Sequence, residues 1–153
     1  MSEADRSTES QTWNRQTEVV VLAGNRPLIP RVSQLTEAFW ARLAGGVFGV
    51  AHCEQCGRLS FPPRANCPAC GSSGMGWQPV SGDATVYSAT VVHAAPAMFE
   101  AQAPYALVVL DLVEGVRLVT RWVGAASPHC DQLARLVVIK HEDGILFGAK
   151  ERP

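Results

Sequence analysis

The sequence carries little excess charge of either sign. Lys and Arg together number 13, Asp and Glu number 14, and the formal net charge at pH 7 is −1. Binding to nucleic acid or to an anionic membrane surface depends largely on concentrated positive charge. Aromatic side chains, on which single-stranded bases stack, make up only 7% of the residues. Charge and aromatic content therefore give no reason to expect a protein that binds nucleic acid or a membrane surface.

Long hydrophobic runs are also missing. The apolar run VVVLA at 19–23 is far shorter than the roughly 20 residues that a membrane-spanning helix needs. The N-terminal segment MSEADRSTES is polar and has no basic stretch leading into an apolar one, so no export signal is expected. We therefore predict a cytoplasmic protein without a membrane span. In such a reducing compartment, paired cysteines more often bind metal than form disulfides.

The patterns along the chain predict four segments. The 153 residues are enough for one ordinary domain or two very small ones, and 47% of them are hydrophobic. The expected segments are a flexible N-terminal tail at 1–27, a helical lead-in at 28–46, a cysteine-rich ribbon at 47–79 and a β-rich domain at 80–153.

The lead-in contains a predicted amphipathic helix in SQLTEAFWARLAGG. Ser33 is a candidate N-cap, and the glycines at 45–46 are expected to end the helix. Four apolar residues fall on one face at helical spacing, namely Leu35, Phe39, Trp40 and Leu43. Such an apolar stripe has to be covered by another part of the protein.

From residue 80 the pattern changes to short strands separated by turns. The two-residue turn signals are Glu114-Gly115 and Asp143-Gly144. Five strands are predicted, at 83–94, 105–113, 116–123, 135–142 and 145–150. The stretch 105–113 is apolar on both sides, which indicates a central strand. Because no room is left for crossover helices, a small closed antiparallel barrel is the expected fold.

Four of the five cysteines form two Cys-x-x-Cys pairs, each followed by a glycine. They are Cys53, Cys56, Cys67 and Cys70, with ten residues between the pairs. This spacing predicts a tetrahedral four-thiolate site, for which Zn²⁺ is the preferred ion, and a glycine after each pair permits a positive φ. Iron, disulfides and free thiols are the alternatives. A closed thiolate site has no open position for substrate, so we expect it to stabilise the fold rather than to catalyse a reaction.

Few other residues are candidates for chemistry. Cys130 is adjacent to His129 in a loop, but neighbours in sequence do not make a catalytic pair, so an inert thiol is expected. Arg117 and Arg121 share one predicted strand face and could hold a phosphate or carboxylate, although a solvated face paired with acidic residues is more common.

The strand at 83–94 and the loop after it also supply candidates. Alternation along the strand places His93 on the same face as Tyr87 and Val91, opposite the predicted core face with Val86. The loop AAPAMFEAQAP at 94–104 is unusually apolar. It either folds back on the barrel or docks onto a partner or ligand. The candidate contact residues here are His93, Met98, Phe99 and Tyr105.

The order of these motifs resembles the family called domain of unknown function thirty-five. The motifs that carry the resemblance are FW at 39–40, C-x-x-CG at 53–57, FPPR at 61–64, CPACGS at 67–72, VYSATVVH at 86–93 and EGVRL at 114–118. The resemblance implies a mainly β fold, with an N-terminal helix, a rubredoxin-like zinc ribbon and a five-stranded OB-fold barrel at 80–153. It assigns one structural zinc ion to the four paired cysteines.

The resemblance also implies a function. Members of this family are accessory subunits of thiolase-superfamily enzymes, including thiolases, acyltransferases and steroid side-chain aldolases of lipid metabolism. We therefore expect a non-catalytic scaffold in a hetero-oligomer, with acyl-CoA as a candidate ligand and no catalytic residue of its own. The alternatives are a single-stranded nucleic-acid-binding module, which OB barrels often form, and an electron carrier with iron in the ribbon.

Overall fold

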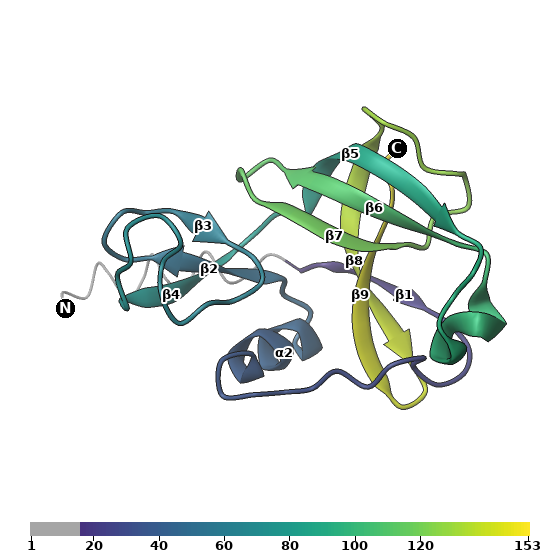
Figure 1. Cartoon of the computed structure of the whole chain (residues 1–153), viewed down its shortest axis with the longest axis horizontal. Helices are drawn as coiled ribbons and strands as arrows, with labels where there is room; N and C mark the ends of the chain where they lie inside the picture. Colours follow the sequence, from purple (N-terminus) through teal and green to yellow (C-terminus); the bar gives the residue numbers. More distant parts are fainter. Residues whose placement is uncertain (1–15) are drawn as a thin grey trace. The chain divides into compact units, whose positions relative to one another are not determined.

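The computed structural model describes residues 16–153, which fall into two compact units (Figure 1). Val32–Ser81 belong to one unit, here called the ribbon unit. Glu18–Arg31 and Gly82–Pro153 belong to the other, here called the barrel unit. Nine strands, one α-helix and one 3-10 helix make up the secondary structure of the described residues, so the fold is mainly β, as predicted.

The ribbon unit consists of one helix and a small antiparallel sheet. Its elements are α2 (Glu37–Ala44), β2 (Gly49–Cys53), β3 (Leu59–Ser60) and β4 (Met75–Pro79). The strands lie in the order β3-β2-β4, so β2 is central. The first cysteine pair therefore begins at the end of the central strand, which fixes its position.

Helix α2 is shorter than predicted at its start. The carbonyl oxygen of Ser33 accepts hydrogen bonds from the N–H groups of Thr36 and Glu37, which makes a turn before the helix begins at Glu37. Ser33 therefore does not cap the helix, and Leu35 lies outside it. The helix ends as predicted, because Gly46 adopts a φ of +85° that only glycine reaches easily.

An aromatic cluster forms the core of the ribbon unit. The rings of Phe39 and Phe48 lie 5.3 Å apart between centroids, and Phe61 lies 5.4 Å from Phe39 and 5.5 Å from Phe48. Phe39 comes from α2, Phe48 precedes β2 and Phe61 follows β3, so the cluster joins the helix to the sheet. The helix buries Phe39 and Leu43, which confirms part of the predicted apolar stripe.

The barrel unit contains a closed five-stranded barrel, as predicted. Its strands are β5 (Asp83–Val92), β6 (Tyr105–Leu112), β7 (Arg117–Trp122), β8 (Leu133–His141) and β9 (Gly144–Glu151). Neighbours follow the order β8-β5-β6-β7-β9, and β9 pairs with β8 to close the sheet. The β7–β9 pairing is parallel and the other pairings of these five strands are antiparallel.

The interior of the barrel is filled by inward-facing aliphatic residues. Leu110 of β6 and Leu136 of β8 are fully buried, and β6 is a central strand because it pairs with both β5 and β7. The predicted faces of β7 are confirmed, since Leu118 and Trp122 are buried and Val119 is exposed. The tight turn between β8 and β9 lies one residue earlier than predicted, because Gly144 already pairs with His141.

The boundary expected for the N-terminal tail differs from the structure. Residues 1–15 of the segment predicted at 1–27 lie outside the described residues. Glu18–Val21 form strand β1, which pairs in parallel with residues 137–140 of β8. The β-branched run at 19–21 explains this, because β-branched residues favour a strand where a partner edge is available. Figure 1 shows β1 beside β8.

A β-bulge changes the predicted alternation along β5. Its pairing with β6 shifts between Val86 and Ser88, so the residues that follow exchange faces. Val91 therefore lies on the same face as Ala89, which pairs with buried Val108, although Val91 itself is 51% exposed near the end of the strand. The bulge directs Val91 towards a surface pocket that is described below.

Candidate metal centre and barrel pocket

The two cysteine pairs adopt the same local geometry. Gly57 donates its N–H to the Cys53 carbonyl at 2.8 Å, and Gly71 donates to the Cys67 carbonyl at 2.9 Å. Both glycines have a φ of +75°, which side chains rarely tolerate. A backbone N–H also points at the first sulfur of each pair, from Cys56 to Cys53 Sγ and from Ala69 to Cys67 Sγ, both at 3.4 Å. These turns hold the sulfurs on one side of the backbone.

The four sulfur atoms converge. Cys53 Sγ lies 3.6 Å from Cys70 Sγ, and Cys56 Sγ lies 3.6 Å from Cys67 Sγ. All four ligand atoms lie within 4.8 Å of one another. Zinc–sulfur bonds of 2.3 Å in a tetrahedron separate the sulfurs by about 3.8 Å. The arrangement therefore fits a single tetrahedral Zn²⁺ ion and supports a structural zinc.

The electrostatics of the thiols point to a cation as well. The backbone N–H of Cys70 is the main cause that lowers the pKa of Cys67 to about 6, and the N–H of Cys56 lowers the pKa of Cys53. For Cys70, the Ser72 N–H lowers the pKa, but burial and the other three sulfurs raise it to about 12. The four thiols thus cannot all ionise together unless a cation offsets their charge.

The barrel unit carries the other predicted contact residues, near the 3-10 helix η1 (Ala97–Gln102). Met98 is 55% exposed, and η1 buries none of its residues. Phe99 and Tyr105 are half-buried, with ring centroids 5.8 Å apart. His93 is exposed just beyond the end of β5. The structure thus brings Phe99 and Tyr105 together and leaves Met98 and His93 open to solvent.

Two residues at this surface, Gln102 and Arg121, form contacts that the sequence analysis did not anticipate. Arg121 Nη1 donates a hydrogen bond to Gln102 Oε1, and the guanidinium lies 5.3 Å from the centroid of the Tyr105 ring. Arg117 is different, because it forms two hydrogen bonds to Asp111, at 2.6 and 2.9 Å. The two arginines share a strand face, as predicted, but they do not form one binding site.

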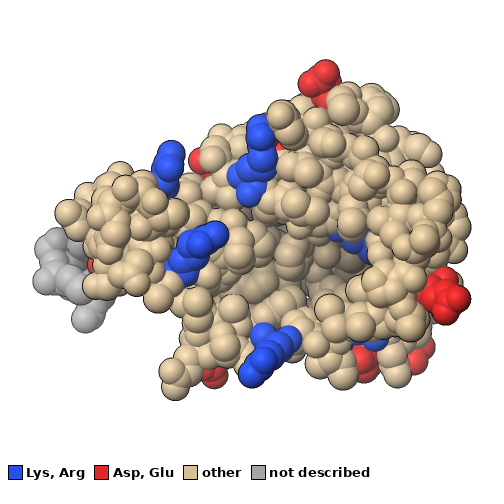
Figure 2. Space-filling model, in the orientation of Figure 1, with Lys and Arg blue, Asp and Glu red and all other residues tan. Residues whose placement is uncertain are grey.

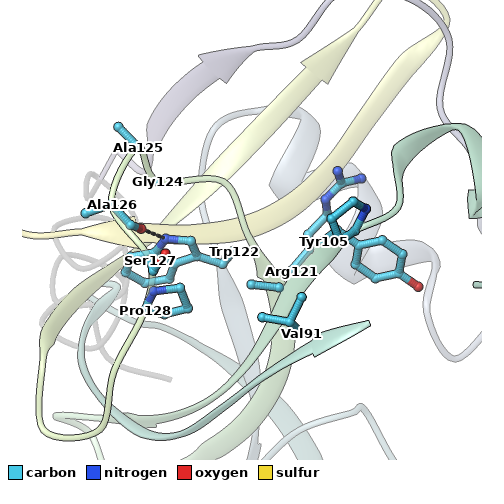
Figure 3. A pocket seen from close by; sticks show the side chains of 11 residues that line it. Val91, Tyr105, Arg121, Trp122, Gly124, Ala125, Ala126, Ser127 and Pro128 are labelled. Carbon is cyan, nitrogen blue, oxygen red and sulfur yellow. Dashed lines mark hydrogen bonds between the residues drawn. The ribbon is translucent and has the colours of Figure 1, made fainter. Parts of the chain in front are cut away.

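Beside Arg121 lies a surface pocket of about 310 Å³ (Figure 3). Trp122 Nε1 donates to the Ala126 carbonyl at 2.7 Å, which attaches the loop after β7 to the barrel. Figure 3 shows Arg121 and Tyr105 on one side of the pocket and the 124–128 loop on the other. Val91, brought here by the bulge in β5, also lines the pocket.

Cys130 takes no part in either site. His129 Nδ1 lies 3.0 Å from the carbonyl oxygen of Cys130 rather than from its sulfur. The Cys130 thiol is exposed and lies outside the four-sulfur cluster. The neighbouring imidazole therefore does not activate this thiol through a hydrogen bond.

The surface charge agrees with the composition. On the face of each unit seen in Figure 2, the described Lys and Arg side chains are isolated spots on a mostly uncharged surface. A groove that follows a nucleic-acid backbone needs a continuous run of such side chains. Among residues 16–153, none of the helices combines the length and the apolar character that crossing a membrane requires.

A four-sulfur ribbon followed by a closed five-stranded barrel defines the class of proteins that join a zinc ribbon to an OB-fold. Family comparisons agree: residues 40–76 match the family described as "ChsH2, rubredoxin-like zinc ribbon domain", and residues 77–139 match "ChsH2, C-terminal OB-fold domain". The chain is 32% identical over 109 residues to a "DUF35 domain-containing scaffold protein" of Methanocaldococcus jannaschii, covering 66% of this chain and 77% of that protein. The chain belongs to the DUF35 family.

Two further similarities concern proteins named as parts of enzymes. A "Probable enoyl-CoA hydratase alpha subunit" of Thermomonospora curvata is 38% identical over 103 residues, which cover 66% of this chain and 30% of that subunit. Among solved structures, the "Ltp2-ChsH2(DUF35) aldolase" is 27% identical with a TM-score of 0.70, covering 80% of this chain and 98% of the matched chain. The match to the hydratase subunit thus spans under a third of its length.

Proposed function

We propose that this chain is a non-catalytic scaffold subunit that binds a thiolase-superfamily enzyme and helps to bind or channel its acyl-CoA substrate. The family relationship supports this, since a relative covered over 77% of its length is named a scaffold protein. A structural neighbour of the same fold is named as part of an aldolase together with a second protein, Ltp2. The partner enzyme would supply the reacting groups.

The observation that carries the proposal is the surface around η1. Apolar burial is the main driving force for folding and for most association, so an ordered segment normally buries its apolar residues. Segment η1 (Ala97–Gln102) has the sequence AMFEAQ and buries none of them. An ordered apolar segment that is left at the surface fits a docking site for a partner protein.

The ribbon would support this role without reacting. Cys53, Cys56, Cys67 and Cys70 would hold one Zn²⁺ ion, and four thiolates fill its coordination so that no position remains for substrate. The metal then serves to order a segment whose own apolar core is small, and it supplies no step of the reaction.

We place the proposed acyl-CoA contacts at the end of the barrel that carries η1. Phe99 and Tyr105 present two half-buried rings there, and His93 and Met98 lie exposed nearby in the sequence. These four residues would contact either the acyl-CoA or the partner surface that binds it. Of the four, Tyr105 also lines the pocket beside Arg121, and this supports a ligand contact.

The proposal is tested by isolating the tagged chain from its own host and identifying the proteins that remain bound through size-exclusion chromatography. We expect a thiolase-superfamily protein in a fixed ratio, and turnover of an acyl-CoA thioester by the complex but not by the chain alone. An isolated chain that turned over the thioester unaided, or that eluted as a monomer without such a protein, would contradict the proposal.

A further inference from the structure

Arg121 and Arg117 lie on one face of β7 but differ in how their charge is balanced. Arg117 forms an ion pair with Asp111 at 2.6 Å and lies 3.6 Å from the centroid of the Tyr87 ring. Arg121 has no carboxylate partner among the described residues, and its polar contact is the neutral amide of Gln102. The guanidinium charge of Arg121 is therefore not neutralised within the described chain.

The surroundings of Arg121 make its unpaired positive charge energetically unfavourable. The side chain is half-buried, and its Nε lies buried without a hydrogen-bond partner in the described residues. Burial lowers the pKa of Arg121, since desolvation disfavours the charged form, and the coulombic interaction with Tyr105 opposes that effect only in part. A buried charge without a counter-ion is rare unless a ligand supplies one.

The adjacent pocket has the composition of an anion site. Arg121 is the only charged residue among the eleven that line it. Ser127 also lines it, and the rest of the lining is largely apolar, as with Val91 and Trp122. The Tyr105 hydroxyl points away from the 124–128 loop (Figure 3). The carboxylate of Glu151 does not line the pocket, but it lies close by, where it accepts a hydrogen bond from the Ala125 N–H and approaches Gly124.

We propose that Arg121 binds the oxyanion group, a phosphate or a carboxylate, of a small molecule whose uncharged part lies in this pocket. The guanidinium supplies the positive charge and its remaining N–H donors, Gln102 holds it in place, and Tyr105 supports it from one side. The volume of about 310 Å³ lies at the lower end of the range for small-molecule sites, which suits a short ligand or one end of a longer one.

The test is a titration of the isolated chain, followed by amide NMR shifts of residues 124–127 at constant ionic strength. Inorganic pyrophosphate probes the phosphate class, and acetate and hexanoate probe the carboxylate class without and with an apolar chain. We expect saturable binding of pyrophosphate or of hexanoate, and the tighter of the two identifies the class of anion. Saturation by neither probe would overturn the proposal.

Three variants make the test specific. Arg121→Gln should weaken binding of the better probe at least tenfold, and Gln102→Glu should do the same because it places a carboxylate against the guanidinium. Arg117→Gln is the matched control, with affinity expected to stay within twofold. Equal losses in Arg117→Gln and Arg121→Gln would indicate general surface attraction and would overturn the proposal.

The outcome is independent of the scaffold role. The titration uses no partner enzyme, so failure of the anion site would leave the partner interaction intact, and the reverse also holds. Because Gln102→Glu is nearly isosteric and lies on the surface segment η1, this variant keeps the test valid if Arg121→Gln fails to fold.

Discussion

The sulfur atoms of Cys53 and Cys70 lie 3.6 Å apart although 17 positions separate the two residues in the chain. The second short contact, from Cys56 to Cys67, likewise connects one cysteine pair with the other. The centre therefore joins two loops that are distant in the chain, next to the hydrogen bond from the Glu54 N–H to the Gly74 carbonyl.

Removal of the metal is expected to unfold the ribbon unit selectively. A strong chelator, or the substitution Cys67→Ser, should collapse the amide spectrum of residues 49–79, because without the ion no bond joins the four sulfurs and that region has a small core. The strands β5–β9 have their own buried core and should keep their dispersed resonances.

Cys130→Ser is the control for this experiment. Its thiol is exposed and lies outside the four-sulfur cluster, so the metal content should stay at one zinc per chain and the spectrum should stay unchanged. Persistence of a folded ribbon in the Cys67→Ser variant, with no metal bound, would show that the centre is not structural.

Phe48→Ala should destabilise the ribbon unit strongly. Phe48 is fully buried between Phe39 and Phe61, and truncation of such a side chain costs about 3–5 kcal/mol of unfolding free energy. Denaturant unfolding checks this value. Val32→Ala, at a side chain that is 55% exposed, should change stability by about 0.5 kcal/mol or less. Similar effects for both variants would argue against the aromatic cluster as the core.

Gly148→Ala tests the closure of the barrel. A Cβ at this position would lie 2.7 Å from Ile139 Cδ1 and 2.9 Å from the Arg121 carbonyl oxygen, which is too close for either contact. Since Gly148 pairs with Arg121 across the parallel β7–β9 edge, the variant should lower stability by about 1–3 kcal/mol. An unchanged melting temperature would mean that β7 and β9 do not meet as described.

Phe99→Asp tests the proposed docking surface. A charge on η1 should weaken the partner complex at least tenfold while the barrel melts normally, because Phe99 is only half-buried within the chain. Affinity is measured by surface plasmon resonance with the purified partner. Val113→Asp, at a 69% exposed site after β6, is the control and should bind normally. If Val113→Asp lost affinity and Phe99→Asp did not, the result would show that η1 is not part of the interface.

The sequence predicted the barrel well because its strands are short, apolar and separated by clear turn signals. The stretches at 105–113 and 116–123 correspond closely to β6 and β7, and Glu114-Gly115 lies between them. The four cysteines were also predictable, since their ligand chemistry is encoded in the spacing itself. The sequence pattern was sufficient to predict an element wherever the residues that determine it lie close together in the chain.

Contacts between distant segments were harder to predict. Strand β1 forms only because β8 offers it an edge about 120 residues later in the chain, as the pairing of Glu18 with Val137 shows. The bulge after Val86 does not appear in the apolar pattern, so the face of Val91 was predicted wrongly. Gln102 gave no signal as the partner of Arg121, because their contact depends on how η1 folds back.

The mass of the native assembly is the most direct test of the central claim. Native mass spectrometry of the chain purified with its host's thiolase-superfamily protein should show one hetero-oligomer of fixed composition, with one zinc ion for each copy of this chain. A spectrum that contains only the free chain beside the free enzyme, under conditions where the enzyme is active, would contradict the account.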